Sequence, residues 1–140
     1  MRILLVEDEA LTAFVVADAL AEAGHVVVGP AASVAAALWL VQQEPVDLAL
    51  LDIDLGTGGD GTELAKCLHK DHRIPSLFVS GSPERARAAN GVALGLLHKP
   101  CSPEQVVSAV TAVPVLLAGE TPDVVPRALE LFPSQERLRA

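Results

Sequence analysis

Aromatic and basic residues are both scarce in this chain of 140 residues: the first shortage affects the composition of the core, and the second narrows the possible functions. Aromatic side chains make up only 3% of the residues, so Ala, Val and Leu supply most of the apolar content. The chain has ten Lys and Arg residues and eighteen Asp and Glu residues, which gives a formal net charge of −8. Because contact with a nucleic-acid backbone needs a clustered basic surface, direct nucleic-acid binding is disfavoured. A protein partner with a basic surface stays open.

Cysteines and long apolar runs are scarce as well. Cys67 and Cys101 are far apart in the sequence and match no metal-binding or redox spacing, which indicates a reducing cytoplasm. No apolar stretch approaches the roughly 20 residues of a membrane-spanning helix. The apolar run after Arg2 meets three acids within a few residues, so it does not resemble a signal peptide. We therefore expect a cytoplasmic protein that does not enter the membrane.

Short apolar runs alternate with helix-like stretches along the first 113 residues, and 51% hydrophobic residues are enough for the core of one domain. Glycines and prolines mark the boundaries, and Ser33 and Ser102 are the expected caps of two helices. The expected strands cover residues 3–6, 26–28, 46–51, 76–79 and 92–98. The expected helices cover residues 11–23, 34–43, 62–70, 83–90 and 103–113. This alternation predicts a parallel sheet with helices on both faces.

The runs 3–6 and 46–51 are continuously apolar, as is typical of strands buried on both faces of a parallel sheet. Right-handed crossovers and the size of the chain favour the strand order 2-1-3-4-5. We therefore predict an α/β fold, a single flavodoxin-like (βα)5 domain over residues 1–113 with a parallel five-stranded sheet.

Residues 114–140 are expected to form a short C-terminal extension. They include four prolines, which exclude a long helix, and one or two short amphipathic helical turns are expected within 127–132. A frayed tail and a docking or dimerisation segment are equal alternatives for this extension.

Acidic residues stand where the first and third strands are expected to end. Glu7 and Asp8 follow the first strand, and Asp52 follows the third. The strand order places these two strand ends side by side, at the sheet edge where open α/β sheets bind ligands. Three carboxylates would repel one another there without a cation, and Mg²⁺ is the natural partner for a cluster of oxygen ligands. We therefore expect a magnesium site at this edge.

A hydroxyl and an amine follow the fourth and fifth strands, as Ser80 and Lys99. This combination suits phosphoryl transfer, because a carboxylate can form an aspartyl phosphate while cations and a hydroxyl stabilise the phosphoryl oxygens. Asp52 comes from the centre of the predicted sheet and is the best-placed nucleophile.

The segments that carry these residues occur in a specific order along the chain: Ile3-Leu4-Leu5-Val6-Glu7-Asp8-Glu9, Leu50-Leu51-Asp52-Ile53-Asp54-Leu55, Asp60-Gly61-Thr62-Glu63-Leu64, Val79-Ser80-Gly81 and His98-Lys99-Pro100. Together they resemble the receiver domain of two-component response regulators over about residues 1–113. The resemblance implies a switch in which Asp52 accepts a phosphoryl group from a phosphohistidine on a histidine kinase or phosphotransfer protein. Such a domain catalyses only its own phosphorylation and dephosphorylation, and is not a conventional enzyme.

The same resemblance implies roles for the other residues of the set. Asp8 would bind Mg²⁺ directly, Glu7 would bind it through water, and the backbone carbonyl of Asp54 would be a further ligand. Ser80 would move to bind the phosphoryl group, and Lys99 would pair with it. The side chain of Asp54 occupies a position that tunes the access of water to the phosphoryl group. Output would pass through a downstream protein partner, and a homodimer stays open.

Two features depart from the receiver pattern. Leu96 stands three residues before Lys99, where receivers often carry a Tyr or Phe switch residue, so a backbone shift or a helix displacement is expected to carry the signal. The segment from Ser80 to Lys99 is also short, and a brief fourth helix is expected there.

Two alternative functions use the same residues. The motif Asp52-Ile53-Asp54 also resembles the paired aspartates of haloacid-dehalogenase-like phosphatases, but those proteins carry the motif on the first strand and need a longer chain. The second alternative is a receiver fold that binds proteins without being phosphorylated. The complete set of strand-end acids, hydroxyl and amine favours the switch over both.

Overall fold

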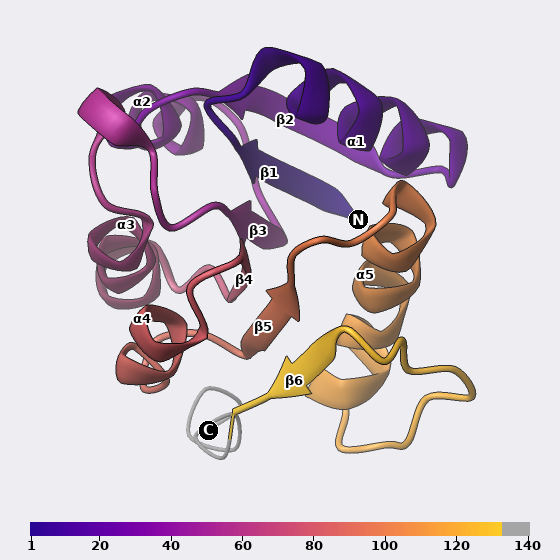
Figure 1. The fold of residues 1–140 in the computed structure, drawn as a ribbon. Coiled ribbons are helices and arrows are strands. Elements are labelled where there is room, and N and C mark those ends of the chain that lie inside the picture. Colours follow the sequence, from indigo (N-terminus) through magenta and orange to yellow (C-terminus); the bar gives the residue numbers. More distant parts are fainter. Residues whose placement is uncertain (133–140) are drawn as a thin grey trace.

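The structure, a computed structural model, describes residues 1–132, in which helices cover both faces of one sheet (Figure 1). The strand order is β2-β1-β3-β4-β5-β6, and all neighbouring strands are parallel except β5 and β6. The strands are β1 (Arg2–Val6), β2 (Val26–Ala31), β3 (Leu48–Leu51), β4 (Ser76–Ser80), β5 (Gly95–His98) and β6 (Leu129–Leu131). The predicted flavodoxin-like order 2-1-3-4-5 is confirmed, with one more strand at its edge.

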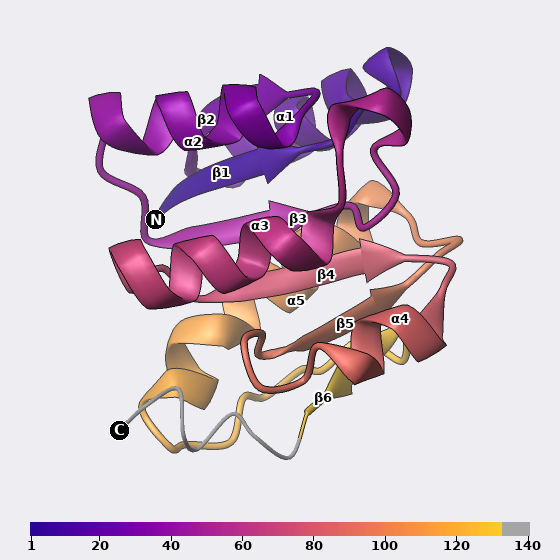
Figure 2. The same ribbon diagram turned by 90° about the vertical axis from the view of Figure 1, so that its left-hand side faces the viewer.

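Within the described residues, five α-helices pack on the two faces of the sheet (Figures 1 and 2). One face is covered by α1 (Ala10–Glu22) and α5 (Pro103–Leu117), and the other by α2 (Val34–Gln43), α3 (Gly61–Cys67) and α4 (Pro83–Ala88). Two single turns complete the helical elements, η1 (Gly56–Gly58) and the π-helical η2 (Leu68–His72). The predicted brief fourth helix is confirmed by the short α4.

Alternating residues of the central strands fill two separate cores. In β1, Ile3 and Leu5 belong to the core beneath α1 and α5, whereas Leu4 and Val6 belong to the core beneath the other helices. All four residues of β3 are buried, as the continuously apolar run predicts. The carboxyl ends of β1 and β3 are therefore held in fixed positions side by side.

The two predicted helix caps are confirmed. The hydroxyl of Ser33 accepts a hydrogen bond of 3.1 Å from the backbone N–H of Ala36 at the start of α2. At the start of α5, Ser102 and Gln105 bond reciprocally to each other's backbone N–H. The cap at Ser102 fixes the start of α5, which begins shortly after Lys99.

The prediction for the C-terminal region was wrong in two respects. Helix α5 continues through Pro114 to Leu117 instead of ending near residue 113. A proline removes one backbone donor, and apolar contacts of Leu117 with the core hold the last turn in place. The expected helical turn within 127–132 is instead the antiparallel strand β6. The rest of the predicted extension, residues 133–140, lies outside the described residues.

Several predicted boundaries also shift by a few residues. Strand β2 runs on through Gly29 and Pro30 to Ala31, which an edge strand tolerates because one of its sides needs no ladder hydrogen bond. Strands β3 and β5 begin two and three residues later than predicted, and the helix expected over 62–70 divides into α3 and η2. Within residues 1–132, no helix has the length and apolar character needed to cross a membrane.

Candidate functional site

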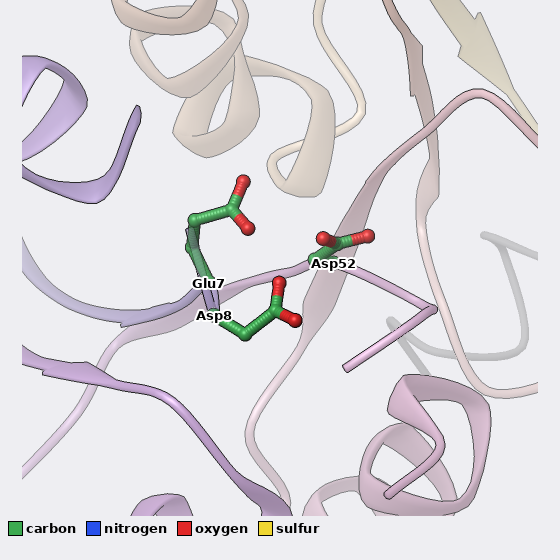
Figure 3. Close-up of side chains that lie close together, drawn as sticks. All are labelled: Glu7, Asp8 and Asp52. Carbon is green, nitrogen blue, oxygen red and sulfur yellow. The ribbon is translucent and has the colours of Figure 1, made fainter. Parts of the chain in front are cut away.

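Three carboxylates meet at the carboxyl edge of the sheet (Figure 3). The pairing of β1 with β3 sets Val6 beside Leu51, so Glu7 and Asp52 leave neighbouring strands at the same level. One carboxylate oxygen from each of Glu7, Asp8 and Asp52 lies within 4.8 Å of the others. Glu7 is 8% exposed and the Asp52 side chain 12% exposed, whereas Asp8 is open to solvent. The structure thus brings together the three strand-end acids.

The ammonium of Lys99 lies against two of these carboxylates. Its Nζ is 3.3 Å from Oε1 of Glu7 and 3.4 Å from Oδ2 of Asp52. Partial burial acts to lower the pKa of Lys99, but the charges of Asp52 and Glu7 and the hydrogen bonds to both outweigh burial, and the net pKa is raised. Lys99 therefore stays charged at neutral pH. It is one positive charge beside three negative ones.

Backbone donors fix the orientation of the Glu7 and Asp52 carboxylates. The second oxygen of Glu7 accepts a hydrogen bond of 3.1 Å from the N–H of Glu9. The second oxygen of Asp52, Oδ1, accepts one of 3.3 Å from the N–H of Asp54. Each carboxylate therefore has one oxygen held by the backbone and the other turned to Lys99.

The loop after β3 is held close to Asp52 by a glycine. A Cβ at Gly61 would collide with the backbone carbonyl oxygen of Asp52, so the first residue of α3 needs to be glycine to pack there. Asp54 lies in this loop and is exposed, and its side chain accepts a hydrogen bond of 3.1 Å from Gly56 N–H. Asp54 therefore contacts Asp52 through its backbone N–H, while its own side chain turns into the loop.

Ser80 ends β4, the strand between β3 and β5. It is 3% exposed, and its hydroxyl accepts a hydrogen bond of 3.0 Å from the N–H of Ser82, directly before α4. Its carbonyl accepts the backbone N–H of Lys99 at 3.0 Å. Ser80 thus connects the end of β5 with the start of α4.

The donor set fits a hard divalent cation. Carboxylate oxygens are the preferred ligands of Mg²⁺ and Ca²⁺, and these three converge on one space. Lys99 balances only part of their negative charge. The site can therefore hold a cation beside Asp52 and gains electrostatically from it.

A cavity of about 420 Å³ adjoins the acids and was not predicted from the sequence. It lies between the sheet, α1 and the start of α5, and it is lined by Thr12, Val16, Cys101 and Val106 among others. Burial raises the pKa of the Cys101 thiol although the charge of Lys99 opposes this, so the thiol is protonated at neutral pH. The cavity could not be predicted from the sequence, because it depends on how side chains from separate elements fill the space between them.

Similarity to known proteins covers most of the chain. A family model described as "Response regulator receiver domain" matches residues 3–111. The transcriptional activator protein IrlR of Burkholderia pseudomallei (strain 1026b) is 32% identical over 117 residues, which are 84% of this chain and 50% of IrlR. The chain thus spans about half the length of the curated relatives it matches.

Solved structures agree with the fold. A CheY-like response regulator receiver domain protein from Methanospirillum hungatei JF-1 shares 28% identity with a TM-score of 0.72, covering 80% of this chain and 91% of that one. The chemotaxis response regulator CheY4 of Vibrio cholerae shares 27% identity with a TM-score of 0.70, covering 80% of this chain and 97% of that one. Both matches extend over nearly the whole length of the similar protein.

Proposed function

The chain belongs to the response regulator receiver domain family of two-component signalling, and from this premise we propose that it is a phosphorylation-dependent switch with Asp52 as the phosphoryl acceptor. The donor would be a phosphohistidine on a histidine kinase or a histidine phosphotransfer protein in the cytoplasm. The observation that carries the proposal is the position of Asp52, which shares one cluster with two further acids and the ammonium of Lys99.

Asp52 has the features of a positioned nucleophile. It follows the central strand β3, its side chain is largely buried, and separate donors hold its two oxygens. In the transfer, a carboxylate oxygen of Asp52 forms the new O–P bond while the N–P bond of the phosphohistidine breaks. The imidazole leaves with the electron pair of that bond. Fixing the carboxylate beforehand reduces the entropic cost of this alignment.

The carboxylates of Glu7, Asp8 and Asp52, with the backbone carbonyl of Asp54, are the groups we propose to hold Mg²⁺. The bound ion supplies positive charge beside the transferring phosphoryl group, whose oxygens carry the developing negative charge. Oxygen ligands and an excess of negative charge both support this assignment.

Lys99 and Ser80 would stabilise the phosphorylated form. Lys99 already lies 3.4 Å from an oxygen of Asp52, and its raised pKa keeps it charged and able to pair with a phosphoryl oxygen. The hydroxyl of Ser80 would turn away from the N–H of Ser82 and donate a hydrogen bond to another phosphoryl oxygen. The turn of Ser80 and the new pairing of Lys99 would transmit the change at Asp52 into the backbone at the ends of β4 and β5.

Receiver domains are signalling modules and not classical enzymes, and we propose that this one acts through a downstream protein partner. The formal net charge of −8 gives no basis for direct binding to nucleic acid. A protein partner that reads the state of Asp52 is therefore the better assignment for the output.

Incubation with acetyl phosphate and Mg²⁺, followed by intact-mass measurement, tests the proposal. The expected product is a labile adduct of one phosphoryl group, absent in EDTA and absent in Asp52→Asn. Asp18→Asn is the matched control, because Asp18 is an exposed acid on α1 away from the cluster. Rapid hydrolysis of many phosphate esters would instead support a phosphatase, and neither reaction would support a binding module that works without phosphorylation.

A further inference from the structure

The edge strand β6 is attached to β5 along its whole length. Leu129, Glu130 and Leu131 pair with Leu97, Leu96 and Gly95 in antiparallel register. Hydrogen bonds from His98 N–H to the carbonyl of Ala128, 2.8 Å, and from Phe132 N–H to the carbonyl of Leu94, 3.0 Å, close the two ends. Figure 1 shows β6 at the outer edge of the sheet, beyond β5. The chain thus covers a sheet edge with its own C-terminal segment.

The side chains of this segment alternate between two kinds of contact. Leu129 and Leu131 face α5 and line a small apolar gap there with Val113 and Leu117. On the opposite face, Phe132 is 2% exposed and joins the core beneath α4. Apolar side chains therefore anchor the strand on both faces of the sheet.

Glu130 provides the polar contact of the segment. Its two carboxylate oxygens accept hydrogen bonds of 2.8 Å each from the guanidinium of Arg87 on α4. One of these oxygens also lies 2.9 Å from Nε2 of His98 on β5. Such a bidentate pair recognises a carboxylate by its geometry as well as its charge.

The β5 edge is shaped for the close approach of a strand. A Cβ at Gly95 would collide with the carbonyl oxygen of Glu130, so glycine at this position keeps the edge accessible. The linker between α5 and β6 is mostly exposed, with Val124 67% and Val125 45% exposed. Because β6 pairs with a neighbouring strand on one side only, it can leave this edge more easily than a strand inside the sheet, which pairs on both sides.

We propose that the β5 edge, together with Arg87 and His98, is a docking surface for an extended segment of a partner protein, and that β6 occupies it as an internal ligand. The partner segment would add one antiparallel strand, as in other cases of β-augmentation. It would direct a carboxylate to Arg87 and His98 and flank it with apolar side chains. Residues 129–132 themselves define this chemistry, because they show which segment the surface accepts.

The surface is connected to Asp52 at two points, and this part of the inference rests on the proposed function. His98 directly precedes Lys99, which would turn to a phosphoryl group on Asp52. Arg87 lies on α4, whose preceding residue Ser82 would lose its hydrogen bond when the Ser80 hydroxyl turns to the same group. Both partners of Glu130 therefore belong to segments expected to shift, so phosphorylation would weaken the hold on β6.

Peptide exchange tests the docking surface without phosphorylation. The probe is the synthetic peptide Arg-Ala-Leu-Glu-Leu-Phe, with the sequence of residues 127–132, titrated into the isotope-labelled full chain and followed by NMR. The internal strand competes at the high effective concentration of a tethered segment. Because Glu130→Gln weakens the internal strand but leaves Arg87 and His98 in place, it should bind the peptide about threefold to tenfold more tightly than wild type.

Two matched controls sharpen the test. Glu120→Gln removes an exposed acid of the linker and should bind the peptide as wild type does. A peptide with Gln in place of Glu should lose the same factor in affinity for the Glu130→Gln protein. Equal affinity in all three proteins, or shifts centred away from β5 and α4, would overturn the proposal. So would a Glu130→Gln dimer that exchanges β6 between copies, because the occupant would then be a second copy of the chain.

Hydrogen exchange tests the connection to Asp52. After treatment with acetyl phosphate and Mg²⁺, the amides of His98 and Phe132 should exchange at least about threefold faster in protein whose mass shows the phosphoryl group. Unchanged protection in phosphorylated protein would overturn the coupling. A missing mass increase would instead refute the proposed function. The peptide titration would then still test, independently, whether the β5 edge is a docking surface.

Discussion

Neutralising one acid of the strand-end cluster tests whether the cluster is built for a cation. Asp8→Asn removes the exposed acid and preserves its size. Unit charges 4.8 Å apart, the limit observed for these carboxylate oxygens, repel by about 0.9 kcal/mol at the dielectric constant of water and about 3.5 kcal/mol at an effective value of 20. Solvent and salt screen an exposed acid, so the lower figure applies. We expect the variant to gain about 1 kcal/mol in unfolding free energy in EDTA, or about 3–5 °C in Tm.

In Mg²⁺, wild type should become more stable than Asp8→Asn. At a free concentration ten times its dissociation constant, a ligand specific for the folded state adds about 1.4 kcal/mol to the unfolding free energy. Wild type should show this gain and Asp8→Asn should lose most of it. The assay is urea unfolding followed by circular dichroism, in EDTA and in Mg²⁺, with Asp18→Asn as the control. A variant less stable than wild type in EDTA, or an equal gain from Mg²⁺ in both proteins, would refute the reasoning.

Three further predictions concern the loop after β3 and the C-terminal strand. Asp54→Ala should change the rate of aspartyl-phosphate hydrolysis more than the rate of phosphorylation, both followed by intact mass; equal changes in the two rates would count against a role in water access. Hydrogen bonds from Arg87 and His98 lower the pKa of Glu130 from 4.5 to about 2, so its stabilising effect is present above pH 4.5 and is lost as the pH falls towards 2. Urea unfolding should therefore find wild type about 1 kcal/mol more stable than Glu130→Gln at pH 7 and equal to it near pH 2; a difference independent of pH would contradict this. Gly95→Ala should cost about 1–3 kcal/mol and expose the Phe132 amide to hydrogen exchange, whereas Gly91→Ala, whose Cβ would meet open space, should do neither.

The ends of β1 and β3 and the starts of α2 and α5 were predictable from the sequence because local chemistry decides them. The apolar runs that became β1 and β3 are buried over most of their length, and an acid directly after each has to lie at the carboxyl edge. The hydroxyls of Ser33 and Ser102 accept the backbone donors of the helices they precede. Right-handed crossovers then allow few strand orders, so the neighbouring positions of Glu7 and Asp52 followed from the pattern.

The C-terminal region was not predictable because distant contacts decide its structure. Pro114 indicated a helix end, but apolar contacts with the sheet carry α5 on to Leu117. Residues 129–131 do alternate apolar and acidic side chains, yet so short a segment has no strand signal apart from its pairing with β5. The contacts of Glu130 with Arg87 and His98 cross more than thirty residues of sequence and depend on that pairing.

Leu96, which stands where receivers often carry an aromatic residue, lies next to the additional strand β6. It is fully buried in β5 opposite Glu130 of β6. Phe132 lies in the same core cluster and supplies an aromatic ring from a different part of the chain. The departure at Leu96 was visible in the sequence, but its structural counterpart in β6 was not.

Mapping the phosphorylated residue tests the central claim most directly. After incubation with acetyl phosphate and Mg²⁺, borohydride reduces the acyl phosphate of a phosphorylated aspartate to homoserine, which peptide mass spectrometry locates. The convergence of Glu7, Asp8 and Lys99 on Asp52 predicts homoserine at position 52 alone, and none when EDTA replaces Mg²⁺. Homoserine at another acid, or no conversion in Mg²⁺, would contradict the assignment of this cluster as a phosphoryl-acceptor site.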